Sequence, residues 1–81
     1  LNCEQTVEYP ELWLTVVDKT WAWARKQADC RFEAARRRYA REDWRKTCRE
    51  LQISNSTRRR LLDFVRMYAA LQAVQLGLIK V

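Results

Sequence analysis

The chain has 81 residues, which is enough for one small folded domain and too few for two. Hydrophobic residues make up 48% of the chain, and it contains one glycine and one proline, a composition that favours helices joined by few turns. There are 16 basic and 10 acidic residues but no histidine, and no glycine-rich phosphate loop or activated nucleophile is visible. The composition therefore argues against an enzyme, and we expect no cofactor.

The positive charge is concentrated in the middle of the chain. Residues 1–24 hold one basic and four acidic groups, whereas residues 25–60 hold 13 basic and five acidic groups. Twelve of the 16 basic residues are arginines, whose planar guanidinium group binds phosphate through paired hydrogen bonds. This pattern is typical of a surface that binds a polyanion. Codon bias also raises arginine content, so the composition leaves both explanations open.

The three cysteines are Cys3, Cys30 and Cys48, which form no Cys-x-x-Cys pair. Without histidine they could not complete a four-ligand zinc site, so we expect no metal. Two of them could form a disulfide in an exported protein, whereas buried free thiols are commoner in the cytosol. The most apolar stretch, residues 69–81, is too short to span a membrane.

Residues 1–9 show no periodicity and are predicted to form an extended lead-in to a single helical domain over residues 10–81. Pro10 suits the first position of a helix, where its missing N–H is not needed. From Trp13 to Tyr39 apolar residues recur every three or four positions, which predicts one continuous helix of about 27 residues.

The apolar pattern shifts by one residue near Arg41. Either the helix drifts gently there or the chain makes a tight corner with Asp43 as the N-cap of the next helix, and we favour the corner. Residues 52–57 are predicted to form a polar turn. The final helix should begin at Ser56 or Thr57 and end at Gly77, which can adopt a left-handed conformation. The prediction is an all-α fold, a small bundle or hairpin of three helices, one of them long.

Three consecutive arginines, Arg58, Arg59 and Arg60, fall at the start of this last helix. The helix dipole already makes that end positive, so cations there cost from a few tenths to about 1 kcal/mol each. A bound anion such as phosphate would offset this cost. The alternative is a solvated cluster partly neutralised by Asp63, four residues after Arg59.

The segment 44–62 resembles a helix-turn-helix DNA-binding unit, with Cys48 at the small-residue position of the first helix. This resemblance implies that the second helix enters the major groove, N-terminal residues foremost. Two positions depart from the pattern. Gln52 replaces the usual turn glycine, and Arg58 replaces a buried valine or isoleucine.

A narrower resemblance is to one family of phage terminase small subunits, which carry the signature Leu-Gly-Leu-Thr-Pro-Ser-Ser-Arg-x-Arg-Leu. The matching segment, residues 51–61, reads Leu-Gln-Ile-Ser-Asn-Ser-Thr-Arg-Arg-Arg-Leu, so Gln52 and Asn55 depart from the family's glycine and proline. The resemblance covers 11 of the 81 residues. It implies a non-catalytic, oligomer-forming DNA recogniser that works with a separate large subunit.

A competing resemblance is to secreted bacterial lysozyme-inhibitor-like proteins, through Trp21, Arg25, Cys30 and Cys48. The spacing from Arg25 to Cys30 is one residue longer than in that family. The resemblance implies a Cys30–Cys48 disulfide and a secreted or periplasmic interaction module: an inhibitor, immunity or exclusion factor with an acidic protein partner.

The tryptophans could stack on bases, although at helical spacing they more often belong to a core or an interface. Trp21 and Trp23 project about 160° apart on a helix, so both should not fit one small core. We therefore expect a homo-oligomer whose interface includes Trp13, Trp21 and Trp23.

The sequence thus predicts a small, basic, cytoplasmic protein that binds nucleic acid, DNA rather than RNA, without catalysis. The predicted nucleic-acid-binding residues are Arg37, Arg41, Arg45, Arg49, Ser54, Asn55, Arg58, Arg59 and Arg60.

Overall fold

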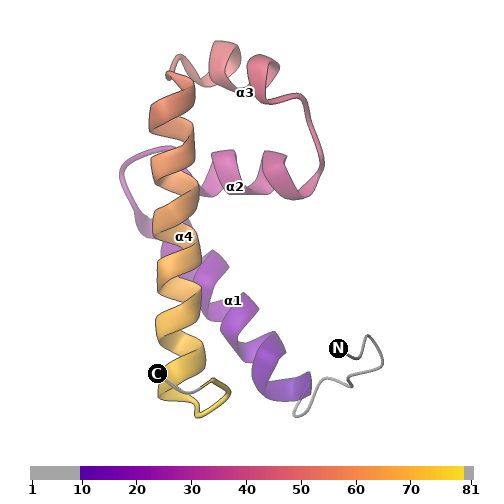
Figure 1. Ribbon diagram of the computed structural model, residues 1–81, viewed down its shortest axis with the longest axis vertical. Helices are drawn as coiled ribbons and strands as arrows, with labels where there is room; N and C mark the ends of the chain where they lie inside the picture. The colour runs from indigo at the N-terminus through magenta and orange to yellow at the C-terminus, as the bar shows by residue number, and fades with distance from the viewer. Residues whose placement is uncertain (1–9, 80–81) are drawn as a thin grey trace.

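The computed structural model describes residues 10–79, so the predicted lead-in of residues 1–9 lies outside it. In this part the helices are α1 (Pro10–Lys26), α2 (Arg31–Tyr39), α3 (Trp44–Leu51) and α4 (Asn55–Gln75). Helix α4 runs along the long axis of the molecule, α1 packs beside its C-terminal half, α2 crosses its N-terminal half, and α3 lies at its N-terminal end (Figure 1). The described residues contain no strand, which confirms the all-α class, with four helices in place of three.

The predicted continuous helix over residues 13–39 is wrong, because the chain bends at residues 27–30. There the Asp29 carboxylate accepts a hydrogen bond from the backbone N–H of Arg31 at 3.1 Å and pairs with its guanidinium group at 2.7 Å. Such a side chain-to-backbone bond competes with helix. The bend turns α2 across α4, so that Ala35 packs in a buried cluster with Val65. The apolar period was correct within each helix, but its continuity was not.

The tight corner before α3 is confirmed. Asp43 is the N-cap of α3, and its carboxylate accepts a hydrogen bond from the backbone N–H of Arg45 at 3.2 Å. Arg41 in this corner and Gln52 just after α3 have positive φ angles, 60° and 58°. A left-handed conformation costs a residue with a Cβ roughly 1–2 kcal/mol. Gln52 therefore adopts the conformation for which glycine is usual after a helix.

Local signals also set both ends of α4. The Ser54 hydroxyl caps its first turn by accepting a hydrogen bond from the backbone N–H of Thr57 at 3.1 Å, and the helix begins one residue earlier than predicted. At the other end Gly77 has a φ of 76°, and its N–H donates to the carbonyl of Val74. The N–H of Leu78 donates to the carbonyl of Ala73, which completes a Schellman ending. The predicted role of Gly77 is confirmed.

The core is built from small and medium-sized side chains, with aromatic rings packed around it. Trp21 meets the ring of Phe32 on α2 edge-on at 5.5 Å between centroids. Trp23 stacks on Tyr68 of α4 at 4.3 Å. Both tryptophans also pack against the buried cluster. The expectation that one core could not hold both is therefore wrong, because α1 has α2 on one side and α4 on another.

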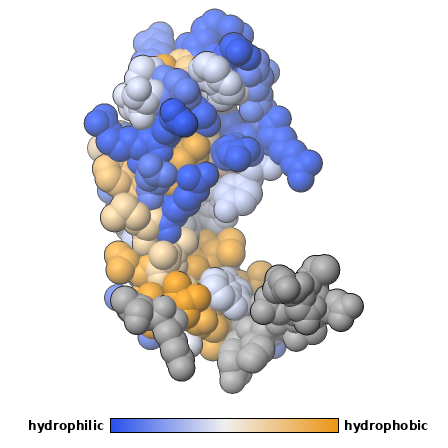
Figure 2. Space-filling view, in the orientation of Figure 1, coloured by the Kyte–Doolittle hydropathy of each residue, from blue (hydrophilic) through white to orange (hydrophobic). Residues whose placement is uncertain are grey.

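Polar and apolar surfaces separate along the long axis. Figure 2 shows hydrophilic side chains gathered over the α3 end of the molecule, whereas apolar side chains gather over α1 and the C-terminal half of α4. None of the described helices has the length and apolar character that crossing a membrane requires.

Candidate nucleic-acid interface

The corner before α3, helix α3 itself and the first turns of α4 carry many arginines, and they lie at the end of the molecule where Figure 2 shows hydrophilic side chains gathered. Arg59 and Arg60 are exposed there, and Arg58 is half-buried. The Nε of Arg58 donates a hydrogen bond to the Asn55 side-chain oxygen at 3.0 Å, and its guanidinium group lies 5.9 Å from the centroid of the Trp44 ring. Within residues 10–79 only the Nε of Arg58 is bonded, so no side chain in this part of the protein occupies its terminal nitrogens.

None of the three arginines forms an ion pair with a carboxylate of residues 10–79. Asp63, the partner considered for Arg59, pairs with Arg66 at 3.2 Å. The three cations at the positive end of α4 are therefore not neutralised by the part of the chain that the structure describes.

A cleft of about 720 Å³ opens beside these arginines. Arg58 and Arg59 of α4 form one side, and Trp44 at the start of α3 forms another. The full lining is Arg38, Glu42, Asp43, Trp44, Arg58, Arg59, Leu62, Asp63 and Arg66. The sequence analysis did not single out Arg66, because its position at the cleft depends on how α2, α3 and α4 pack.

The other predicted residues of the turn, Ser54 and Asn55, form hydrogen bonds within the protein. The Ser54 hydroxyl accepts from the Thr57 backbone and donates to the Thr57 hydroxyl at 3.0 Å, so its hydrogen bonds serve the cap of α4. Asn55 holds Arg58 through the 3.0 Å bond described above. Both residues therefore position the start of α4 and its first arginine.

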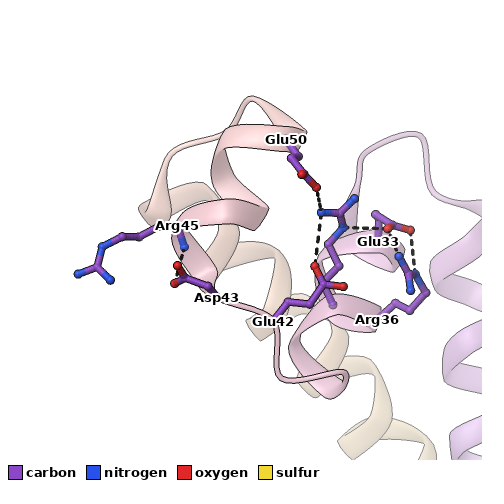
Figure 3. Close-up of polar contacts among 7 residues, drawn as sticks. Glu33, Arg36, Glu42, Asp43, Arg45 and Glu50 are labelled. Carbon is purple, nitrogen blue, oxygen red and sulfur yellow. Dashed lines mark hydrogen bonds and ion pairs between the residues drawn. The ribbon is translucent and has the colours of Figure 1, made fainter.

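Arg37 differs from the other predicted arginines, because its guanidinium group is engaged in ion pairs inside the molecule. It pairs with Glu33 at 2.9 Å, with Glu42 at 3.7 Å and with Glu50 on α3. Its side chain is 17% exposed. In Figure 3 the side chains of Glu33, Glu42 and Glu50 turn toward the same region between α2 and α3. These hydrogen bonds raise the pKa of Arg37 further above its ordinary value. Arg37 joins α2 to α3, and a phosphate contact by this residue stays a prediction that would have to compete with these carboxylates.

The same network acts on the acidic partners. Hydrogen bonds from Arg36 and Arg37 lower the pKa of Glu33 from its ordinary 4.5 to about 2. The hydrogen bond from Arg37 also lowers the pKa of Glu50. Both carboxylates therefore stay ionised throughout the neutral range. Their ion-pair partners are Arg36 and Arg37 on α2, not the arginines at the start of α4.

Three further predicted residues, Arg41, Arg45 and Arg49, are exposed and form no ion pair within residues 10–79. The guanidinium group of Arg45 lies over the Trp44 ring at 4.8 Å from its centroid, a favourable cation–π contact. Together with the start of α4, these residues make the α3 end of the molecule strongly cationic.

The disulfide implied by the resemblance to secreted inhibitors is not formed, because Cys30 and Cys48 are free. Cys30 is the N-cap residue of α2, whereas Cys48 lies within α3, so the two occupy different elements. Cys3 lies outside the described residues.

The predicted oligomer interface is covered in part by the chain itself. Trp21 and Trp23 pack on α2 and α4, and Trp13 is half-buried. The large hydrophobic side chains that remain exposed on α1 and α4 are Leu14, Val17, Phe64, Met67 and Leu71.

In residues 10–79 no group of three or more cysteine, aspartate or glutamate side chains is placed to hold a metal ion. Comparisons of this chain with protein families, with curated proteins and with solved structures found no match.

Proposed function

We propose that this chain is a small, basic, non-catalytic protein that binds nucleic acid, DNA in preference to RNA, through the α3 end of the molecule. In this proposal α3, the connection at residues 52–54 and α4 act as a helix-turn-helix unit, with the start of α4 facing the phosphates or the major groove. The finer proposal, a phage-type DNA recogniser that works with a separate catalytic subunit, rests on the resemblance of residues 51–61 to phage terminase small subunits.

The observation that carries the proposal is a difference in pairing among arginines. Arg36 and Arg37 on α2 and Arg66 on α4 are paired with carboxylates, whereas Arg59 and Arg60 have no such partner within residues 10–79. Exposed guanidinium groups near the start of a helix repel one another, although at residues 59 and 60, in the second turn of α4, the helix dipole adds little because its effect falls off within the first turn. A phosphate held by arginine forks would relieve this repulsion.

The test is the salt dependence of duplex DNA binding, measured by fluorescence anisotropy. Each phosphate neutralised contributes about −0.9 to the slope of log K against log salt. Replacing Arg58, Arg59 and Arg60 by alanine should therefore make the slope shallower by roughly two to three units.

A matched control removes three basic residues from α1, through Lys19→Ala, Arg25→Ala and Lys26→Ala. Both triple variants remove three positive charges, so the change in net charge is the same. Like Arg59 and Arg60, the three side chains of the control are exposed and form no ion pair in the described part of the chain. The control should leave the slope close to that of the original protein. Equal slopes for all three proteins would eliminate the start of α4 as the contact site.

A second candidate is a protein–protein interaction module whose basic end meets an acidic partner. The exposed apolar side chains of α4, Met67 at 60% and Leu71 at 58%, favour a protein contact somewhere on the molecule. This candidate predicts no measurable binding of duplex DNA at low salt. Counting reactive thiols in the native protein tests whether this second candidate is an exported protein. In that case a Cys30–Cys48 disulfide would leave neither of these two thiols reactive.

We also propose that the protein self-associates through its apolar half. Leu14 and Val17 on α1 are exposed at 63% and 45%, and they lie on the same helix as the predicted interface tryptophans. Sedimentation velocity over a range of protein concentrations tests this, and Leu14→Glu with Val17→Glu should shift any oligomer to monomer.

A further inference from the structure

We propose that the cleft beside Trp44 receives a single unpaired nucleotide of a nucleic-acid strand, with its base on the Trp44 ring and its phosphate on Arg58 and Arg59. This inference rests on the proposed nucleic-acid binding and adds the form of the ligand. A site for an unpaired nucleotide would direct the protein to strand ends, gaps or bases turned out of the helix.

Trp44 is placed for contact with a ligand. It is the first residue of α3, and 40% of its surface is exposed even though a large aromatic side chain favours burial. The Asp43 cap fixes the start of α3 and so fixes the position of the ring. The guanidinium groups of Arg45 and Arg58 lie 4.8 Å and 5.9 Å from the ring centroid, so a stacking base would take the place of one of them over the ring while Arg58 stays beside it in the cleft.

The carboxylates in the cleft are already engaged. Glu42 pairs with Arg37 at 3.7 Å, and Asp63 pairs with Arg66 at 3.2 Å. The Asp43 carboxylate accepts the backbone hydrogen bond that caps α3. Arg58 and Arg59, by contrast, form no ion pair within residues 10–79, so the cations at the cleft exceed what its acids neutralise.

The size of the cleft suits a single nucleotide. Its volume, about 720 Å³, falls within the roughly 300–1,000 Å³ typical of small-molecule sites. A base inside a duplex has no free face for the ring, because neighbouring base pairs cover both of its faces. Stacking on an aromatic side chain requires an exposed base face, which only an unpaired nucleotide offers.

The experiment compares two DNA hairpins of identical stem, one blunt and one with a three-nucleotide unpaired 3′ tail. We expect the tailed hairpin to bind about 5- to 150-fold more tightly, the range that one stacked base contributes. Trp44→Leu should abolish this preference, measured for each protein as the ratio of its affinities for the tailed and the blunt hairpin. Trp44→Phe, which keeps an aromatic ring, should retain most of the preference.

Tyr39→Leu is the matched control, because Tyr39 is an aromatic side chain with 77% exposure that does not line this cleft. It should keep the full preference for the tailed hairpin. Equal binding of the two hairpins, or a preference that survives Trp44→Leu, would overturn the inference. The proposed function would still stand in that case if the salt slope were steep. If the unmodified protein bound neither hairpin, the proposed function itself would be rejected. A free deoxynucleoside monophosphate that competes as well as the tailed hairpin would overturn the assignment to a strand.

Discussion

Two sets of arginines lie near one another and differ in what their guanidinium groups contact. On α2, Arg36 and Arg37 are paired with Glu33, and Arg37 also reaches Glu50 on α3. At the start of α4, Arg59 and Arg60 are exposed, and no carboxylate of residues 10–79 pairs with them. In the first set Arg37 joins α2 to α3, and the second set is available for contact with a ligand.

This difference teaches that the position of the acidic residues matters more than their number. Glu33, Glu42 and Glu50 all converge on one arginine, while the acid closest to the α4 cluster along the chain, Asp63, pairs with Arg66. The same residue type therefore has a structural role on α2 and a proposed binding role on α4. Changes that affect one role without the other test the comparison.

Arg37→Ala should have the largest effect on stability of any single arginine change. It removes three ion-pair partners at once and leaves the carboxylates of Glu33, Glu42 and Glu50 near one another without a cation. We expect a clear fall in Tm by circular dichroism and an unchanged salt slope for DNA binding.

Arg36→Ala is the control for this change, because Arg36 pairs with Glu33 only and its side chain is 50% exposed. An exposed pair of this kind contributes little. If the two alanine variants melted at the same temperature, the Arg37 network would not be what joins α2 to α3.

The stability of the arginine network should fall in acid. The pKa of Glu33 is lowered from 4.5 to about 2, because hydrogen bonds from Arg36 and Arg37 favour its ionised form. Between these values the unfolded chain binds the proton more readily, so this stabilisation is fully present above about pH 4.5 and is lost as the pH falls toward 2. Melting curves from about pH 7 down to the lowest pH at which the protein stays folded measure it. Glu33→Gln should flatten the dependence, and parallel curves for the two proteins would contradict this cause.

Gln52→Gly should stabilise the protein by about 1 kcal/mol without changing any charge, because glycine carries no penalty at a φ of 58°. Gly77→Ala should have the opposite sign and a similar size. A Cβ at residue 77 would meet no atom within 4 Å, so only the φ of 76° opposes it. Urea denaturation of the two variants measures both effects. If Gln52→Gly gave no gain, compensating interactions of the glutamine side chain would have to exist.

The smallest expected change in stability comes from the arginines at the start of α4, and it distinguishes a binding role from a structural role. Arg59→Ala with Arg60→Ala should raise stability by no more than a few tenths of a kcal/mol, because the two cations lie in the second turn of α4, where the dipole effect has fallen off. The same double variant should bind duplex DNA more weakly. At about 0.1 M salt the slope per phosphate implies a reduction close to tenfold for each phosphate that is no longer neutralised. A variant in which both stability and binding fell would show that these arginines support the fold instead.

The sequence alone determined the features that depend on neighbours within a few residues. Pro10 begins a helix, Asp43 and Ser54 cap the starts of α3 and α4, and Gly77 ends α4 in a left-handed conformation. Each follows from a side chain-to-backbone hydrogen bond or from a φ preference, and both are local. For the same reason the cluster of Arg58 to Arg60 at a helix start could be predicted.

Only the tertiary structure decided how the helices divide and which charges are neutralised. The bend at residues 27–30 lets α2 pack across α4, and a periodic apolar pattern is equally compatible with an unbroken helix. Arg37 meets Glu50, thirteen positions further along, because α2 and α3 lie side by side. Trp44 reaches the cleft with Arg58 for a similar reason. These pairings depend on contacts between helices, and helical periodicity determines only which side of its own helix a residue occupies.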